Sequence, residues 1–302
     1  METARLFEEL RPAAFAVAYR MLGSVSEAED VVQEAFLRLH RAGADGERLA
    51  SPRAYLLTIV TRLCIDQLRS ARAQRERYVG EWLPEPLVAD DEADPARQAE
   101  VADSLSLAFL VLLERLSPEQ RAAFLLREVF DYPYDQIAGI VGKSEDNARQ
   151  LVARARRHVQ EGRPRFEASR ERREALARRF FAAVSDGDLR TLEELLARDV
   201  VLHGDGGGKA PALAHPVHGS SKVARTLLAW MRAAVRIGGV TMRSAEVNGQ
   251  PGALVLDPEG RLVNVMALDV ADGQVQAVSS IVNPDKLRHL GPLANLGEVL
   301  GE

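Results

Sequence analysis

The segment from Leu116 to Val159 constrains the fold of this chain more than any other. It opens with Ser117-Pro118-Glu119-Gln120, a capping box that places Pro at the first position of a helix. Residues 134–141 have the apolar spacing of a short packing helix, and Gly142-Lys143 supplies a tight turn after it. A capped helix, a short helix and a turn are therefore predicted in close succession, with one more helix to follow.

The helix after the turn begins behind Ser144, a good N-cap, and carries Glu145 and Asp146 in its first turn. An apolar stripe at i, i+3, i+4 and i+7 is formed by Ala148, Leu151, Val152 and Ala155. The other faces carry side chains that can pair with base edges or phosphates: Asn147, Arg149, Gln150, Arg154, Arg156 and Arg157. This pattern predicts a helix-turn-helix that contacts DNA through Ser144, Asn147, Arg149, Gln150, Arg154 and Arg157.

The charge of the chain is segregated rather than uniformly basic. The net charge is −5, yet residues 149–173 hold nine Arg against three Glu, a local net charge of +6. Residues 81–103 hold eight acidic residues against one Arg, a local net charge of −7. Contact with a polyanion beside an acidic linker is therefore expected. Taken alone, the Arg-rich helix is also compatible with a helical bundle whose arginines lie on a solvent-exposed face.

Residues 1–79 are predicted to be helical. A capping box at Ser26–Glu29 opens one helix, and Ser51-Pro52 caps another that is apolar as far as Ile65. The second of these helices then becomes basic, through Arg62, Arg69, Arg72 and Arg75. Its basic end is either a DNA-facing element or a solvated helix end. The single cysteine, Cys64, excludes an intramolecular disulfide and is predicted to lie in the core.

A linker is predicted at residues 80–103, where prolines and acidic residues oppose a long helix. Trp82 and Leu83 within it are costly to expose to water, so both are expected to dock on a neighbouring domain. The expected boundaries are 1–79, 80–103, 104–163, 170–290 and a tail at 291–302.

The pattern changes after Ser169. Two helices around Phe180 and Leu192 are followed by a strand-like run at 200–203 and a third helix at 220–235. Alternating segments separated by turns then predict antiparallel strands at 241–247, 253–256, 262–270 and 275–282. The expected architecture is α+β, with helices on one side of a curved sheet.

Several segments together fit one known pattern. Gly23–Arg41 and Ser51–Arg75 are similar to the sigma-2 segments for clamp docking and the −10 element, and Leu116–Val159 is similar to sigma-4, the −35 reader. Phe180–Lys209 is similar to the opening of a SnoaL-like, NTF2-like domain. Three short motifs, WLPEP, DGGGK and NPDKL, stand in order at Trp82–Pro86, Asp205–Lys209 and Asn283–Leu287. Nearly the whole chain thus resembles a bacterial RNA polymerase sigma factor of the extracytoplasmic-function (ECF) type, in the SigJ-type subgroup.

The resemblance implies two all-α sigma domains, a sigma-2 helical bundle and a sigma-4 helix-turn-helix, followed by an α+β SnoaL-like cone. It implies an alternative sigma factor that binds core RNA polymerase, at the β′ clamp and β flap, and promoter DNA. The clamp contacts would be Asp30, Gln33, Glu34 and Phe36. The −10 contacts would be Arg62, Arg69, Arg72 and Arg75. Contacts of a regulatory fused domain would be Trp82, Leu83, Asp205, Lys209, Asn283, Asp285 and Lys286. No cofactor, metal or membrane partner is implied, and a small ligand in the cone is a further expectation.

Other functions agree less well with the sequence. A Walker loop needs Gly and Ser or Thr where the run at 203–210 has His203 and Ala210, so nucleotide hydrolysis is not predicted. SnoaL-like relatives include polyketide cyclases, which makes an acid–base or metal cluster conceivable at His203, Asp205, His215 and His218. A sensing role is preferred, and the chain is not expected to be an enzyme. Two alternatives stay open: a dimeric ligand-responsive repressor or activator, and a cyclase or isomerase with a DNA-binding appendage. The sequence shows no signal peptide or membrane span, so the cytoplasm is the expected compartment.

Overall fold

The computed structural model describes residues 2–44, 51–75, 78–89, 105–162, 169–236 and 238–294. The chain divides into two compact units. The N-terminal unit consists of Met1–Arg77 and Leu110–Arg163, and the C-terminal unit consists of Tyr78–Phe109 and Pro164–Glu302. Most of the predicted linker therefore belongs with the C-terminal unit as far as it is described, up to Ala89, and its residues 90–103 lie outside the described part.

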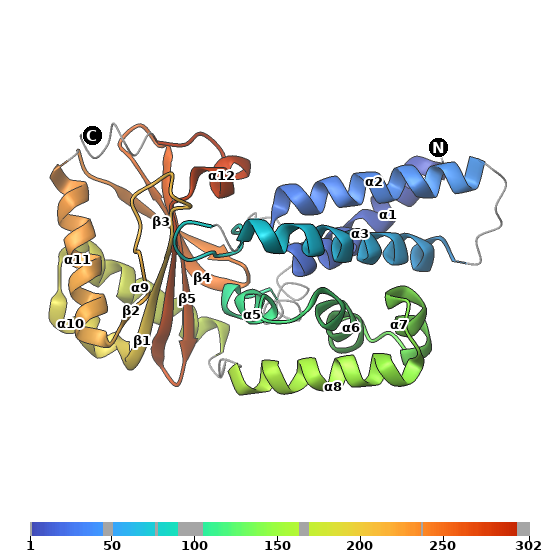
Figure 1. The fold of residues 1–302 in the computed structure, drawn as a ribbon. Helices are drawn as coiled ribbons and strands as arrows, with labels where there is room; N and C mark the ends of the chain where they lie inside the picture. Colours follow the sequence, from blue (N-terminus) through green and yellow to red (C-terminus); the bar gives the residue numbers. More distant parts are fainter. Residues whose placement is uncertain are drawn as a thin grey trace. The chain divides into compact units, whose positions relative to one another are not determined.

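The N-terminal unit is helical throughout the part of it that the structure describes (Figure 1). Its first group of helices is α1 (Glu2–Leu22), α2 (Val25–Ala44) and α3 (Pro52–Arg75). Its second group is α6 (Pro118–Glu128), α7 (Tyr134–Val141) and α8 (Glu145–Gly162). Helix α5 (Leu107–Leu113) carries the chain from the C-terminal unit back into the N-terminal one.

The first group of helices is held together by side chains that the amphipathic pattern turns inward. Tyr19 and Val60 are fully buried, and so is Cys64, which confirms the expected core position of the cysteine. Burial also raises the pKa of the Cys64 thiol. The predicted capping box was placed two residues too late: α2 begins at Val25, and the Glu27 amide donates to the Ser24 hydroxyl at 3.2 Å. The turn from α1 into α2 puts Gly23 at a φ of 67°, which brings Ser24 into the capping position.

The second group of helices matches the predicted helix-turn-helix. The capping box is present in α6, where the Gln120 amide donates to the Ser117 hydroxyl at 3.2 Å. Helix α7 covers the predicted residues and ends at Gly142, whose φ of 66° lets the chain turn sharply into α8. The apolar stripe of α8 packs on α6 and α7 through buried residues that include Ala148 and Val152.

The C-terminal unit is an α+β domain with a mixed sheet. It contains the strands β1 (Leu196–Asp205), β2 (Val217–His218), β3 (Thr241–Val247), β4 (Gln250–Leu256), β5 (Leu262–Ala271) and β6 (Gln274–Ile281). Their order is β2-β1-β6-β5-β4-β3, and β1 runs parallel to β6 while the other neighbours are antiparallel. Strand β1 is longer than the predicted run at 200–203, because it already begins at Leu196.

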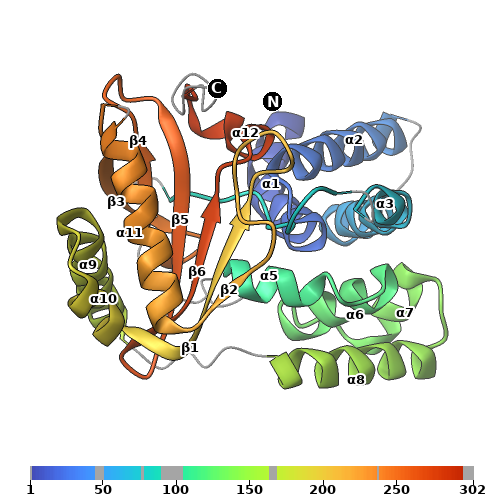
Figure 2. The same ribbon diagram turned by 60° about the vertical axis from the view of Figure 1, so that its left-hand side comes forward.

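Three helices cover one face of this sheet, as Figure 2 shows: α9 (Arg170–Asp186), α10 (Leu189–Leu195) and α11 (Ser220–Arg236). Phe180 on α9 and Leu227 on α11 reach the sheet residues Leu202 and Leu268 in one buried cluster. Short segments, α12 (Pro284–Leu287) and a 3-10 turn at Arg288–Leu290, follow β6. Among the described residues, no helix combines the length and apolarity needed to cross a membrane.

Candidate functional site

The exposed surface of α8 presents all six predicted DNA-binding residues. The Ser144 hydroxyl accepts a hydrogen bond from the Asn147 amide at 3.3 Å, so the serine acts as the helix cap. Arg149 forms an ion pair with Glu145, and its guanidinium lies 4.5 Å from the centre of the Tyr134 ring. Gln150, Arg154 and Arg157 are exposed on the same helix. The arrangement offers donors and cations along one accessible helix surface, as a groove-binding helix requires.

The basic end of α3 contacts the helix-turn-helix. Arg62 donates to the carbonyl oxygens of Gly139 at 2.8 Å and Ile140 at 3.1 Å, both on α7. Arg69 pairs with Glu119 of α6 at 2.5 Å, and this pair raises the pKa of Arg69. Two of the predicted −10 residues are therefore engaged by α6 and α7 in this state. Arg72 and Arg75 fall in the last turns of α3, where the side chains lie outside the described part of the chain.

A buried arginine joins the two helical groups. Arg121 of α6 is 2% exposed, and its guanidinium donates to the carbonyl oxygens of Met21 at 2.5 Å and Leu113 at 2.9 Å. It also pairs with Glu114 at 2.7 Å. Burial lowers the pKa of Arg121 to about 9, which still leaves the group charged at neutral pH. A cation is therefore held inside the N-terminal unit, and Met21 at the end of α1 is one of its partners.

The predicted clamp contacts lie on α2. Asp30 and Gln33 are exposed, Glu34 pairs with Arg38 at 2.7 Å, and Phe36 packs on Phe7 with ring centres 4.5 Å apart. A groove of about 520 Å³ runs between α1 and α2. Its walls are Phe7, Arg11, Phe15, Glu29, Val32, Gln33, Phe36 and Leu37. This face combines an apolar groove with a polar rim, the usual composition of a protein-binding surface.

The segment Tyr78–Ala89, called the docked linker here, is held by a buried carboxylate of the C-terminal unit. Asp205, at the end of β1, is fully buried. Its carboxylate accepts from the Tyr78 hydroxyl at 2.5 Å, the Leu83 amide at 2.8 Å and the Lys286 ammonium at 2.6 Å. Lys286 also donates to the Leu83 carbonyl and lies 4.3 Å from the centre of the Trp82 ring. Burial and the hydrogen bond to Asp205 both raise the pKa of Tyr78.

The other predicted regulatory residues join the same network. The Asn283 amide donates to the Tyr78 hydroxyl at 2.7 Å, and the Asp285 backbone amide donates to the Asn283 side chain at 3.1 Å. Asp285 pairs in turn with Lys209. The three short motifs of the sequence thus meet at one place, although more than a hundred residues separate the first from the second.

The glycines of the 205–209 loop permit this close approach. A Cβ atom on Gly207 would lie 2.2 Å from the Asn283 amide nitrogen and 2.9 Å from the Tyr78 hydroxyl. The φ of Gly207 is also +58°, a value that favours glycine. Gly206 accepts hydrogen bonds from the amides of Lys209 and Ala210, so the loop is a tight turn as well. The loop is therefore a tight turn whose glycines also make room for the linker.

Asn248, which the sequence analysis did not single out, binds the linker at two points. It lies in the turn between β3 and β4 with a φ of 52°. Its side chain accepts from the Leu87 amide at 2.9 Å and donates to the Leu105 carbonyl at 2.9 Å. Its own amide donates to the Leu87 carbonyl at 2.7 Å. Asn248 therefore binds both the docked linker, at Leu87, and the segment that leads into α5, at Leu105.

The histidines considered as catalytic or metal-binding residues are not gathered together. His203 Nδ1 lies 2.7 Å from Glu81 of the docked linker, whereas His215 and His218 are exposed. Asp205 is occupied by its three donors. Within the described ranges, no group of three or more His, Cys, Asp or Glu side chains is arranged to hold a metal ion.

Comparisons with known proteins define the class of this chain. The family model for Sigma-70 region 2 matches residues 6–74, and the model for Sigma-70, region 4 matches residues 106–159. The ECF RNA polymerase sigma factor SigJ of Mycobacterium tuberculosis is 40% identical over 289 residues, which cover 93% of this chain and 91% of the relative. The probable ECF sigma factor SigI of the same species is 34% identical and covers 90% of each chain. The crystal structure of Mycobacterium tuberculosis SigJ superposes with a TM-score of 0.77 at 38% identity, over 96% of this chain and 100% of that one.

The chain belongs to the ECF RNA polymerase sigma factors. It is an alternative sigma factor for transcription initiation, and its sigma domains imply binding to core RNA polymerase and promoter DNA. The predicted fold class, two helical sigma domains followed by an α+β domain, is confirmed. The relatives indicate a transcription factor.

A buried acid in the sheet of the C-terminal unit predicts a pH-dependent stability. Asp269 on β5 is 6% exposed, and burial raises its pKa from 3.8 to about 6, against a smaller opposing effect of His203. Because the folded pKa is raised, stability falls as pH rises from about 4 to about 6 and stays reduced above that. We expect Asp269→Asn to raise the free energy of unfolding of the C-terminal unit by about 2–3 kcal/mol at pH 7.5. At pH 4 the gain disappears.

Thermal unfolding at pH 4, 6 and 7.5 measures this effect. Asp272→Asn, in the turn that follows β5, is the matched control and changes stability equally at every pH. A gain of the same size at pH 4 and pH 7.5 for Asp269→Asn would mean that ionisation of Asp269 is not its cause.

Proposed function

We propose that this sigma factor reads its promoter through α8 at the −35 element and α3 at the −10 element, and that the described N-terminal unit is its closed state. The observation that carries this proposal is the direct contact between the sigma-2 and sigma-4 regions. Arg62 and Arg69 of α3 are bonded to α7 and α6, and Arg121 ties α6 to the end of α1. Arg62 and Arg69 cannot be bonded to α7 and α6 and to a DNA backbone at the same time.

The dimensions of DNA support an opening step. The two promoter elements are centred about 25 base pairs apart, which corresponds to about 85 Å of B-form DNA. Helices α3 and α7 are joined by hydrogen bonds of 2.8 and 3.1 Å. Sigma-2 and sigma-4 must therefore separate before one protein contacts both elements.

The docked linker supplies a way to control that separation. Fully extended, residues 78–106 span about 100 Å, enough to join the two sigma domains across both elements. In the docked state Asn248 holds Leu87 and Leu105 together. The stretch of chain that can extend between the sigma domains is then reduced to residues 78–87, which span about 35 Å at most. Docking on the C-terminal unit therefore restrains the sigma domains, and undocking releases them.

The core polymerase contact is assigned to the α1–α2 groove and its rim. Gln33 and Phe36 line the groove, whereas Asp30 and Glu34, one helical turn apart, lie on the surface of α2 outside this lining. Acidic and amide groups around an apolar groove suit a basic helical partner such as the β′ clamp. Sigma-4 is proposed to contact the β flap of the polymerase, because the chain resembles sigma factors of this type.

Transcription with core polymerase tests the assignment of α8. We expect Gln150→Ala to lower initiation about 5- to 100-fold at promoters that depend on the −35 element, since a paired base contact contributes about 1–3 kcal/mol. Base changes at one −35 position would then alter initiation less with the Gln150→Ala protein than with the natural protein. Arg154→Ala should instead weaken all −35 sequences alike and reduce the salt dependence of binding by about one charge.

Gln160→Ala, exposed near the end of the same helix, is the matched control and leaves initiation unchanged. Equal activity of the Gln150→Ala and Gln160→Ala proteins would remove α8 from −35 recognition. Tight, sequence-specific binding to duplex DNA without polymerase would favour the dimeric-repressor alternative instead.

A further inference from the structure

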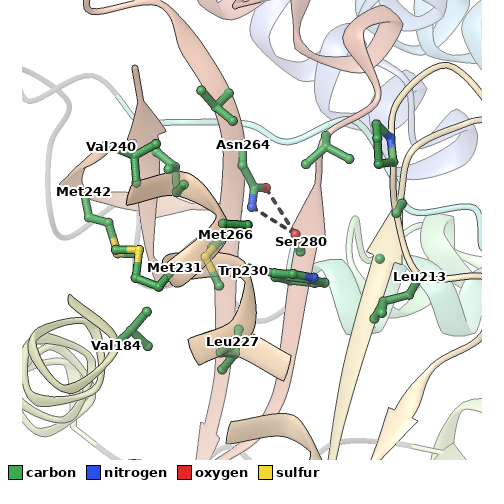
Figure 3. Close-up of a pocket in the computed structure, with 18 residues that line it drawn as sticks. Val184, Leu213, Leu227, Trp230, Met231, Val240, Met242, Asn264, Met266 and Ser280 are labelled. Carbon is green, nitrogen blue, oxygen red and sulfur yellow. Dashed lines mark hydrogen bonds between the residues drawn. The ribbon is translucent and has the colours of Figure 1, made fainter. Parts of the chain in front are cut away.

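The C-terminal unit contains an apolar cavity of about 280 Å³ between α9, α11 and the sheet (Figure 3). Ligand pockets in proteins start at about 300 Å³, so the cavity is near the lower end of that range. An unfilled apolar cavity of this size reduces stability, because the atoms around it lose packing partners. The cavity also opens to solvent past the exposed residues Pro211 and Ala212, so a ligand could enter it, and it is therefore a candidate ligand site.

The walls of the cavity define the chemistry of its occupant. The lining residues include Trp230, Met231, Met242 and Met266, and not one of the eighteen is ionisable. Burial of a charged ligand against such walls would be strongly unfavourable. Thioether side chains adapt to irregular apolar shapes, so the site suits a compact hydrocarbon skeleton.

One polar pair interrupts the apolar walls. The Asn264 amide nitrogen donates to the Ser280 hydroxyl at 3.0 Å, and this hydroxyl lies 3.3 Å from the Asn264 amide oxygen, to which it can donate in turn. The two dashed lines in Figure 3 mark these contacts, and the pair lies on neighbouring strands β5 and β6. The amide and hydroxyl together can donate to and accept from one further polar atom. Pairs of this kind fix the orientation of ligands in pockets that are otherwise apolar.

We propose that this cavity binds a neutral lipophilic molecule of about 10–15 non-hydrogen atoms that carries one carbonyl or hydroxyl group, anchored at Asn264 and Ser280. The absence of an acid or base among the lining residues makes this a binding site rather than a site of turnover.

The cavity adjoins Asp205, the residue that holds the docked linker. Gly204 lines the cavity and pairs in register with Ser280, and the next residue along β1 is Asp205. The Asp205 carbonyl accepts hydrogen bonds from the amides of Val282, also a lining residue, and Asn283. Binding of a ligand in the cavity should therefore be coupled to the hydrogen bonds of Asp205. The effect of this coupling on transcription rests on the proposed function. Ligand binding itself does not.

Titration calorimetry of the full chain with a matched set of probes tests the site. Menthone and menthol supply the polar group, p-menthane has the same skeleton without it, and a p-menthane carboxylate adds a charge. We expect the ketone or alcohol to bind most tightly and to raise the thermal midpoint of the C-terminal unit, and the carboxylate not to bind.

Variants separate the anchor from the fold. Ser280→Ala should weaken binding of the ketone or alcohol about 5- to 20-fold while leaving p-menthane unaffected. Ser279→Ala, on the opposite face of the same strand, is the matched control and should change neither. Ala234→Phe should fill the cavity, abolish binding of every probe and keep the fold. The proposal is overturned if no probe binds, if the carboxylate binds as well as the ketone, or if Ser280→Ala has no selective effect.

Discussion

Replacing Asp205 by Ala is expected to release the docked linker and to lower the free energy of unfolding of the C-terminal unit by about 3–5 kcal/mol. The substitution leaves the Lys286 ammonium, which is 8% exposed, without its carboxylate. It also removes the acceptor for the Tyr78 hydroxyl and the Leu83 amide. An uncompensated buried charge is the larger of these costs.

Thermal unfolding and limited proteolysis measure the two parts of this prediction. A glutamate-specific protease should cut at Glu81 and Glu85 much faster in the Asp205→Ala protein, because both residues lie in the docked linker. Asp199→Ala, at an exposed position of the same strand, is the matched control and should keep the linker protected.

A second variant separates charge from packing. Asp205→Asn combined with Lys286→Met removes both charges, so it should recover part of the stability lost in Asp205→Ala. Continued protection of Glu81 and Glu85 in Asp205→Ala would show that Asp205 does not hold the linker, whatever the change in stability.

The release has a consequence for polymerase binding. A protein whose binding-competent state is only partly populated binds with an affinity reduced by that fraction. If docking restrains the sigma domains, Asp205→Ala should bind core polymerase more tightly than the natural protein. A lower affinity in a variant with a fully released linker would instead make the docked linker part of the polymerase-binding state.

Features encoded within one helix or turn were predictable from the sequence. The stripe Ala148–Ala155, the capping box at Ser117 and the turn at Gly142 all follow from local spacing, and the structure has each of them. The cap of α2 was misplaced because both Ser24 and Ser26 fit the local signal. What decides between them is the turn at Gly23, which local propensity does not reveal.

Contacts between distant segments were predictable only where a motif marked them. Trp82 and Leu83 were expected to dock because their exposure is costly, and both contact Lys286. Asn248 was missed, although Asn248-Gly249 is a strong signal for a hairpin turn, because nothing local indicates that its side chain reaches Leu105. The partners of a polar side chain depend on the assembled fold, in this case across 143 residues.

Arg121 was missed for the same reason, and its replacement by Met is the second large effect that we expect. The substitution removes the Arg121 donor to the Met21 carbonyl, one of the donors to the Leu113 carbonyl, and the ion pair with Glu114. Breaking a buried pair of this kind costs about 3–5 kcal/mol. The N-terminal unit should then unfold about 10 °C lower. Arg127→Met, on the same helix and bonded to Asp131, Tyr132 and the Tyr134 ring of the second helical group, is the matched control and should cost less than about 1 kcal/mol.

The same variant tests the closed state. Spin labels on Ser70→Cys in α3 and Ala153→Cys in α8 report the distance between the two helical groups, and the buried Cys64 should not react. The free natural protein should give one short distance, and the complex with core polymerase and promoter should give a much longer one. Arg121→Met should show the long distances before polymerase is added, because the lost bond to the Met21 carbonyl is the Arg121 contact that joins α6 to α1 in the closed state. A short distance that persists in the promoter complex would contradict the opening step, since sigma-2 and sigma-4 would then reach both elements without separating.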